Sequence, residues 1–208
     1  MCIRDRLHTD ILEKTIFRDY YNLDHSRFLN ITNGIAYRRW LCQSNPALSS
    51  YLQTLIGDGF LKDANALEAL EQYRGDLDVL ENLRAIKRKN KVRLAAYIAE
   101  HNGVNVDPDS IFDVQVKRLH EYKRQLLNVL YILTLYNKIK DHPEKPVFPQ
   151  TFIFAAKASA GYYLAKQIIS LIVAVSNLVN SDPQVQGKLK VVFIEDYKVS
   201  LAEIIIPA

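Results

Sequence analysis

The stretch TFIFAAKASAGYYLAKQIISLIVAVSNLVNSDPQVQGKLKVVFI (Thr151–Ile194) decides the fold of this chain. It opens and closes with apolar runs, Phe152–Ala156 and Leu189–Ile194, whose length and composition are typical of buried strands. Between them, Gly161–Asn180 repeats its apolar residues at helical spacing and ends before the breaker pair Asp182-Pro183. A strand, a long helix and a second strand in this order predict two parallel strands joined by a right-handed crossover.

The same pattern continues upstream of that stretch. Ile111–Val116 alternates apolar and polar residues as a strand does, and His120–Lys140 has the spacing of a second long helix. The order β-α-β-α-β predicts an α/β fold whose ligands bind at the carboxyl ends of the strands. Ahead of it, Arg38–His101 predicts a run of short helices, broken near three glycines, Gly57, Gly59 and Gly75.

Composition favours a globular chain without an obvious nucleic-acid or membrane partner. The 208 residues are 49% hydrophobic, and 27 Lys+Arg against 23 Asp+Glu give a formal charge of only +4. Cys2 and Cys42 form no metal-ligand or CxxC pattern, so we expect no metal site and a reducing compartment. Because no run of about 18 apolar residues and no signal peptide are evident, we expect a cytoplasmic protein.

Cations follow the first predicted strand. Lys117, Arg118 and Lys123 cluster where the strand ends and the helix is expected to start, and free backbone N–H groups at such a place favour an anion. A phosphate-sized ligand fits this cluster, and a solvated basic helix start is the alternative. His120 beside Glu121 could act as a general acid or base, but adjacent helix residues point in different directions, so a structural histidine explains it better.

Other features carry less chemical information. Tyr162 follows a glycine at a strand-to-helix turn, where its ring could stack on a planar ligand or simply pack in the core. The basic run from Arg84 to Arg93 lacks interleaved aromatic residues, so a solvated helix explains it better than nucleic-acid binding. No Walker, dinucleotide-binding, zinc-protease or hydrolase motif is present.

Six blocks of this sequence, in the same order, resemble the α-glucan phosphorylases, the family that includes glycogen, starch and maltodextrin phosphorylases. The likeness as a whole covers nearly the entire chain from Leu7 onward. The blocks are TNGIAYRRWL (Thr32–Leu41), NPALSSYL (Asn45–Leu52), IFDVQVKR (Ile111–Arg118), VKRLHEYKRQLLN (Val116–Asn128), KASAGYYLAKQII (Lys157–Ile169) and VVFIEDYKVSLAE (Val191–Glu203).

The resemblance implies a glycosyltransferase of the two-domain GT-B type with Rossmann-like domains. Residues 7–37 would end the N-terminal domain and the linker, and residues 38–208 would form part of the C-terminal, cofactor-binding domain, in which a helical segment precedes the βαβαβ unit. Inorganic phosphate would cleave terminal α-1,4 linkages of a glucan and release glucose 1-phosphate. The cofactor would be pyridoxal 5′-phosphate, acting through its phosphate group. The parent protein would be a homodimer.

Carried over residue by residue, the resemblance also implies roles for individual side chains. Arg118 would bind the substrate phosphate, and Lys117 and Lys123 would neutralise the cofactor phosphate. His120 would orient their loop, and Tyr122 would contact the sugar or phosphate. The remaining assignments are Asn33 to glucosyl hydroxyls, Trp40 beside the cofactor, Tyr197 and Lys198 at its ring side, and Tyr162 at the cleft entrance.

The chain also departs from the family pattern. Residues 1–6 do not resemble the family, Tyr37 stands for a frequent proline, and Lys198 stands for a frequent arginine. The glycine-rich segment with the cofactor-bearing lysine is not matched before Ala208, so we expect this polypeptide alone to be inactive. Two alternatives stay open at this point: a nucleotide-sugar glycosyltransferase of the same fold, and a non-catalytic phosphate- or sugar-binding module.

Overall fold

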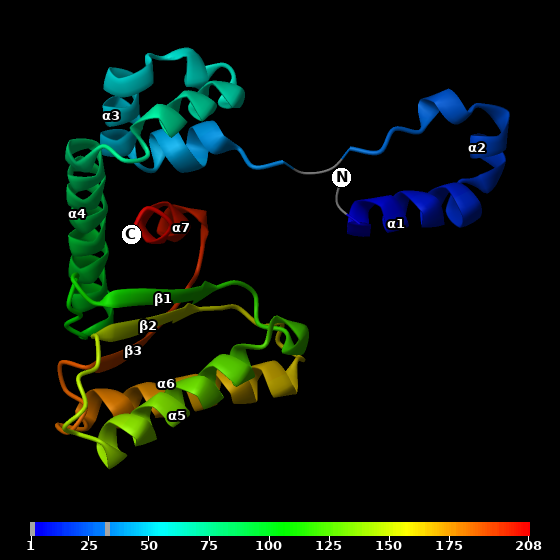
Figure 1. Cartoon of the computed structure of the whole chain (residues 1–208). Coiled ribbons are helices and arrows are strands. Elements are labelled where there is room, and N and C mark those ends of the chain that lie inside the picture. Colours follow the sequence, from blue (N-terminus) through cyan, green and yellow to red (C-terminus); the bar gives the residue numbers. More distant parts are fainter. Residues whose placement is uncertain (1–2, 32–33) are drawn as a thin grey trace. The chain divides into compact units, whose positions relative to one another are not determined.

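The computed structural model describes residues 3–31 and 34–208, which fall into two compact units, Met1–Tyr37 and Arg38–Ala208. The first unit contains helices α1 (Ile3–Ile11), η1 (Leu12–Ile16), α2 (Arg18–Leu23) and η2 (His25–Arg27). An aromatic cluster holds it together, since the ring of Phe28 lies 6.2 Å from Phe17 and 5.3 Å from Tyr21. The second unit carries the sheet and is described by itself below (Figure 1).

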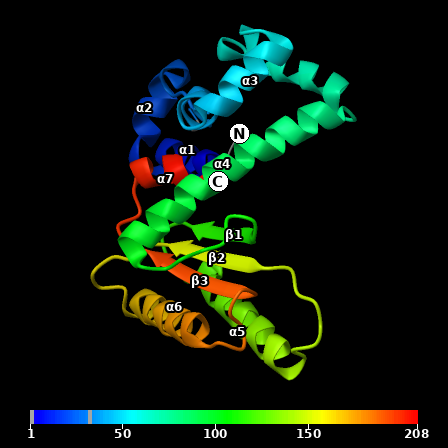
Figure 2. The same ribbon diagram turned by 90° about the vertical axis from the view of Figure 1, so that its left-hand side faces the viewer.

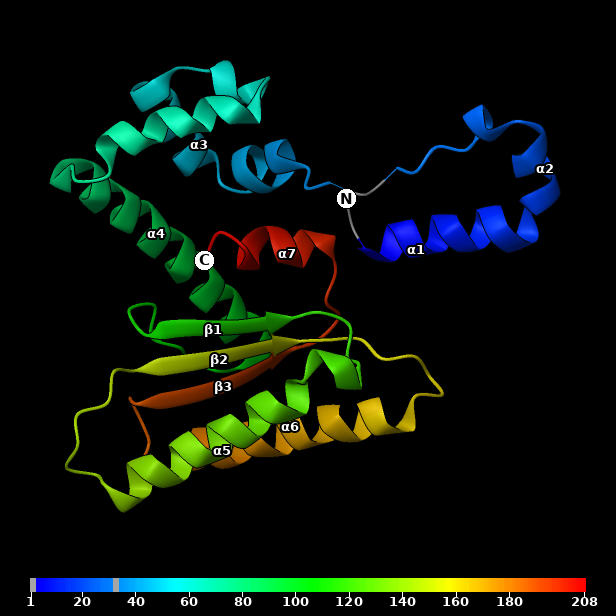
Figure 3. The ribbon, with the colours of Figure 1, turned by 45° about the vertical axis from the view of Figure 1, so that its right-hand side comes forward.

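Three parallel strands form the sheet of the second unit. They are β1 (Ile111–Val116), β2 (Gln150–Ala155) and β3 (Leu189–Ile194), in the order β1-β2-β3. All three arrowheads point the same way in Figure 3, so the carboxyl ends of the strands share one edge. The predicted succession of strands and helices along the chain and the parallel strand direction are confirmed. The middle strand begins two residues earlier than its apolar run suggested.

Helices cover both faces of this sheet (Figures 1 and 2). The crossover helices α5 (Gln125–Asp141) and α6 (Tyr163–Ser181) pack on one face, together with the inward side chains of Phe152 and Phe154. On the other face, α4 (Leu77–Asn102) and α7 (Val199–Ile205) pack against the alternate strand residues. The successive residues of β2 are buried on opposite faces, which explains its continuous apolar run.

The helical segment before the sheet begins with short elements, as predicted. They are η3 (Arg38–Gln43), α3 (Pro46–Ile56), η4 (Gly59–Leu61) and η5 (Ala64–Tyr73), and they are interrupted at the three expected glycines. Beyond Gly75 the prediction of short helices is wrong, because α4 is a single helix of 26 residues. Asp76 caps its start, Gly103 ends it in the left-handed region at φ 66°, and its interior is rich in strong helix formers.

The first crossover helix starts later than predicted. It was expected from His120, but α5 begins at Gln125, and residues before it form a loop with one 3₁₀ turn, η6 (Glu121–Lys123). The backbone N–H of Leu119 donates to Lys157 O at 3.1 Å, so the chain continues alongside β2 beyond the end of β1. Arg124 then adopts φ 61°, a left-handed conformation that no residue inside an α-helix can have.

Helix α6 is long and apolar enough to cross a membrane by length and composition, contrary to the expectation that no such run exists. Its buried residues nevertheless recur on one face: Ala165, Ile168, Ile172, Val175 and Val179. They belong to the core cluster beneath the sheet, so α6 is placed as the core helices of water-soluble proteins are.

The two outer edges of the sheet differ. At the β3 edge, side chains bond to the outward backbone: Asn180 donates to Val191 O at 2.7 Å and accepts from Val191 N at 3.1 Å, and Asn102 donates to Phe193 O at 3.1 Å. At the β1 edge, the outward groups belong to Phe112, Val114 and Val116, for which no hydrogen-bond partner is present within residues 34–208. One edge is therefore closed and the other is open.

Candidate functional site

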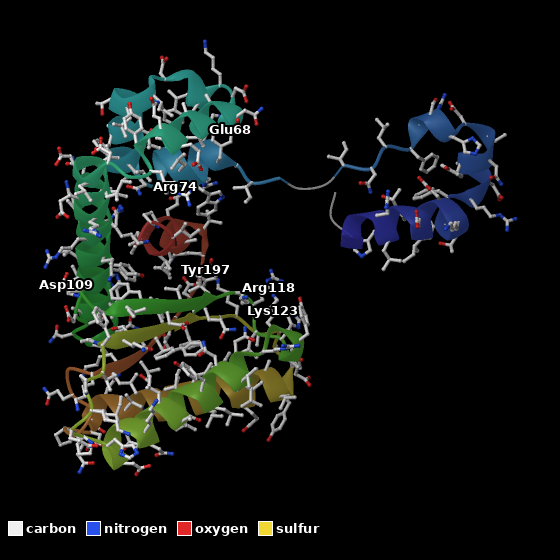
Figure 4. The ribbon with its side chains drawn as sticks, in the orientation of Figure 1. Glu68, Arg74, Asp109, Arg118, Lys123 and Tyr197 are labelled. Atoms are coloured by element: carbon white, nitrogen blue, oxygen red, sulfur yellow. The ribbon has the colours of Figure 1, made fainter. Side chains whose placement is uncertain are left out.

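Three chain segments meet at the carboxyl edge of the sheet, where the sequence predicted a site. They are the loop 117–124 after β1, the turn 157–162 after β2 and the segment 195–198 after β3. Figure 4 labels Arg118 and Lys123, which lie close together just past the tip of β1. The parallel topology thus gathers residues that are up to 81 positions apart along the chain.

The cations of the first loop have no acidic partner. Within residues 34–208, no carboxylate lies within 4 Å of the side chains of Lys117, Arg118 or Lys123. Lys117 and Arg118 are exposed, and Lys123 is half-buried with its Nζ 5.5 Å from the ring centre of Tyr122. Positive charges at one edge without counter-charges among residues 34–208 are an arrangement that favours an anion.

The loop that carries these cations is anchored from below. Leu119, between Arg118 and His120, is only 1% exposed and belongs to the core cluster under the sheet. Its neighbours Lys117 and Arg118 are exposed, so the loop alternates an inward apolar anchor with outward charges. The sequence prediction placed all three cations by the helix start, whereas the structure places them on this loop, ahead of α5.

The cations after the second and third strands are paired instead. Asp196 accepts from Lys157 Nζ and from Lys198 Nζ, both at 2.9 Å. These two lysine hydrogen bonds hold the pKa of the Asp196 carboxyl at about 2. Asp196 also has φ 50°, an unusual conformation for a residue other than glycine.

Sequence reasoning identified Lys198 but not the carboxylate that binds it, Asp196, or the second lysine that shares this carboxylate, Lys157. Both residues lie in blocks that resemble the family, but their pairing was not predicted, and the two positions are 39 residues apart. The available signal was positional, because both follow an apolar strand directly in the chain. Lys198, expected at the ring side of a cofactor, precedes the first residue of α7 and is bound to Asp196.

An aromatic group lies beside the first loop. The ring of His120 stacks on Tyr122 at 5.5 Å and lies 5.7 Å from Tyr162. The Tyr162 hydroxyl donates to Glu121 Oε1 at 2.8 Å, and this hydrogen bond to a carboxylate raises the pKa of Tyr162. Tyr162 therefore ties the turn after β2 to the loop after β1, and Tyr122 stays 72% exposed.

The remaining predicted residues lie on other elements or outside the described residues. Trp40 is half-buried on η3, and the guanidinium of its neighbour Arg39 bonds to Glu203 of α7 at 2.8 Å. Tyr197 packs partly buried against the core on the α7 side of the sheet (Figure 4). Asn33 lies outside the described residues.

This edge is chemically suited to phosphoryl groups. The segments after the three strands carry six Lys or Arg residues and three Asp or Glu residues, and the cations of the first loop are free of carboxylates. Such donors fit the phosphate of pyridoxal phosphate as well as inorganic phosphate, because both present several charged oxygens. A partly exposed aromatic such as Tyr197 suits a planar ring nearby.

Comparison with known proteins gives one consistent result. The family model described as Carbohydrate phosphorylase matches residues 5–208. The chain is 48% identical over 203 residues to the muscle form of glycogen phosphorylase from Oryctolagus cuniculus, and 46% identical to the muscle form from Homo sapiens and the brain form from Bos taurus. Each alignment covers 98% of this chain and 24% of the relative, so the chain spans about a quarter of the length of these relatives.

Proposed function

Because this chain belongs to the carbohydrate phosphorylase family, we propose that its carboxyl sheet edge forms part of the phosphate site of a glucan phosphorylase. The reaction would be phosphorolysis, in which inorganic phosphate cleaves a terminal α-1,4 linkage of a glucan and glucose 1-phosphate leaves. The substrates of the complete protein would be a glucan and phosphate.

One observation carries the proposal: Lys117, Arg118 and Lys123 gather at the end of β1 with no carboxylate within 4 Å in the described part of the second unit. Isolated cations repel one another, and keeping three together is favourable when an anion occupies the space between them. In this proposal Arg118 binds the substrate phosphate in a forked geometry. Lys117 and Lys123 stabilise negative charge on the neighbouring phosphoryl group.

Pyridoxal phosphate fits the same donors. When bound, its phosphate group supplies a proton donor and acceptor for the substrate phosphate. The residues proposed to hold it are Lys117 and Lys123 at the phosphate, Trp40 beside the ring, and Tyr197 with Lys198 at the ring side. Since Asp196 binds Lys198 at 2.9 Å, this lysine would act as one half of an ion pair.

The aromatic residues would shape the rest of the cleft. His120 stacks on Tyr122 and would orient the loop, and Tyr122, exposed beside the cations, would contact the sugar or phosphate. Tyr162 would line the entrance, where its bond to Glu121 fixes the ring. We assign Asn33 to the glucosyl hydroxyls on the family resemblance alone.

At the level of the whole protein, we propose a Rossmann-like domain of a GT-B enzyme. Residues 38–208 would belong to the C-terminal domain, and residues 7–37 would end the N-terminal domain and the linker. We also propose a cytoplasmic location and a homodimeric parent, on the family resemblance.

To test the proposal, residues 7–208 of this chain are inserted into the Oryctolagus cuniculus muscle enzyme in place of its matching segment. This chimera should release glucose 1-phosphate from glycogen and phosphate. Arg118→Ala should lower kcat/KM for phosphate by about 100-fold or more, because it removes a charged donor from developing phosphoryl charge. Bound pyridoxal phosphate, measured by absorbance, should stay near one per chain.

The matched control is Arg93→Ala, which removes an exposed arginine of α4 and should change kcat/KM by less than about twofold. Equal effects of the two substitutions would remove Arg118 from the site. A chimera that transfers glucose from a nucleotide sugar would favour the first alternative, and phosphate binding without turnover would favour a binding module.

A further inference from the structure

Three amide side chains hold the loop 117–124, which carries the site cations and is called the cationic loop below. Two of them bond to its backbone, and the third orients one of these two. Gln115 of β1 donates from Nε2 to the carbonyl oxygen of Lys123 at 3.0 Å. Gln125, the first residue of α5, donates from Nε2 to the carbonyl oxygen of Arg118 at 3.4 Å. Asn128 of α5 donates from Nδ2 to Gln115 Oε1 at 3.1 Å, which orients the Gln115 amide. Two of the three site cations are thus held through their own peptide groups.

Burial makes this arrangement costly to keep. Gln125 is 1% exposed, and its Oε1 has no hydrogen-bond partner among the described residues. A buried oxygen without a partner is unfavourable, and an apolar side chain of similar size would fill the same space without that cost. What a glutamine adds over an apolar side chain at position 125 is the donor Nε2, which bonds to the Arg118 carbonyl. Gln125 therefore contributes to holding the loop more than to core packing.

The loop geometry explains why such donors are required. Arg124 has φ 61°, so the chain leaves helical geometry directly after Lys123. The carbonyls of Arg118 and Lys123 accept from amide side chains of neighbouring elements, Gln125 and Gln115, where a helix would supply backbone donors. The N–H groups of the same two peptide groups bond elsewhere, Leu119 N–H to Lys157 O at 3.1 Å and Arg124 N–H to Glu121 O at 3.0 Å. Loss of an amide donor would therefore leave each peptide group held through its N–H alone, and the attached side chain would be aimed less precisely.

We propose that Gln115, Gln125 and Asn128 are positioning residues that aim Arg118 and Lys123 at one bound phosphoryl group. They touch neither phosphate nor sugar, and they act through the loop backbone. This inference rests on the proposed function, because it presumes that the loop binds phosphate. It goes beyond that function, because it assigns the orientation of the phosphate-binding cations to amide side chains that do not contact the ligand.

The first test measures inorganic phosphate binding to the 208-residue chain by ¹⁵N NMR titration. Gln115→Met and Gln125→Met preserve side-chain length but cannot donate, and each should weaken phosphate binding by about five- to tenfold. Asn180→Ala is the matched control, because it removes a half-buried amide that bonds to the β3 edge. Its phosphate affinity should equal that of the unmodified chain, although its stability falls.

A second variant keeps the test decisive if either methionine variant does not fold. Asn128→Asp replaces the donor to Gln115 Oε1 by an acceptor, so the Gln115 amide should turn over and lose its bond to Lys123 O. Asn128 is only half-buried, and the fold should survive. We expect phosphate binding to weaken about threefold and the amide hydrogen exchange of Lys123 and Arg124 to accelerate.

In the chimera, loss of positioning should raise KM for phosphate and lower kcat together, while Asn180→Ala should change neither by more than about twofold. Unchanged phosphate affinity in both folded methionine variants, or in Asn128→Asp, would overturn the positioning role. An unmodified chain without phosphate binding, together with an inactive unmodified chimera, would instead overturn the proposed function. The two failures are therefore distinguishable.

Discussion

The two groups of cations at the carboxyl edge of the sheet have opposite surroundings. After β1, Lys117, Arg118 and Lys123 have no carboxylate within ion-pair distance in the described part of the unit. After β2 and β3, Lys157 and Lys198 share the single carboxylate of Asp196 at 2.9 Å. The charges of the first group are available to a ligand, whereas those of the second group are partly neutralised by Asp196.

This contrast teaches that position at a strand end does not by itself make a cation functional. All five side chains follow parallel strands. The two groups differ in whether a carboxylate lies beside the cations. Exposed ion pairs add little to stability, so the main effect of Asp196 is to lower the positive potential around two lysines. The following predictions test the contrast, starting with the largest expected effect.

Removing the anchor of the first loop should have the largest effect. Leu119→Ala should lower the free energy of unfolding by about 3 kcal/mol, since a fully buried leucine is lost from the core, and phosphate binding should weaken because the loop is released. Urea unfolding measures the first effect. Leu126→Ala, at a position 41% exposed on α5, is the control and should cost less than about 1 kcal/mol.

The next comparison exchanges one lysine from each group. Lys123→Met should weaken inorganic phosphate binding by about tenfold, because a free charge that binds the ligand is removed. Lys157→Met should weaken it by less than about twofold, since that charge already faces Asp196. Isothermal titration at low ionic strength gives both values, and equal losses would abolish the distinction between the two groups.

Releasing the paired lysines should strengthen anion binding. Asp196→Asn removes the carboxylate from Lys157 and Lys198, and we expect phosphate affinity to rise by about threefold at low salt. The gain should vanish at high salt because it is electrostatic. A decrease in affinity would mean that the carboxylate is needed to orient these lysines at the ligand.

The smallest effect concerns pH. The Asp196 carboxyl has a pKa of about 2, below its ordinary 3.8, so its ion pairs contribute fully above the ordinary pKa and are lost as pH falls through about 2. A carbon-13 titration should give a midpoint near 2. Lys157→Met should raise that midpoint. The pKa of Asp182, which hydrogen bonds from Tyr136 and Lys140 also lower to about 2, should stay unchanged.

Much of the fold could be predicted because its signals are local. The strands before and after α6 are short apolar runs, and breaker residues close each crossover helix, so element order and parallel direction follow from period and length. The start of α5 could not be predicted, since LHEYKR is compatible with a helix. Contacts across the chain, Leu119 to Lys157 and Gln115 to Lys123, instead hold it in a loop with one 3₁₀ turn.

The site was predictable to the same extent. The cations Lys117, Arg118 and Lys123 were identified from their place after a strand, and the structure places all three on the loop after β1, where Figure 4 labels Arg118 and Lys123. The pairing of Lys157 with Asp196 and the bond between Gln125 and Arg118 were not predictable, because each depends on the path of the loops in space. No local sequence pattern indicates such contacts.

The amide caps along β3 also determine how copies of this sheet can join. Asn180 occupies both outward backbone groups of Val191, and Asn102 occupies the carbonyl of Phe193, so a strand that paired from that side would have to displace these amides. Among residues 34–208, the strand groups without such partners lie at the β1 edge. Two asparagine side chains thus direct edge pairing of this unit towards β1.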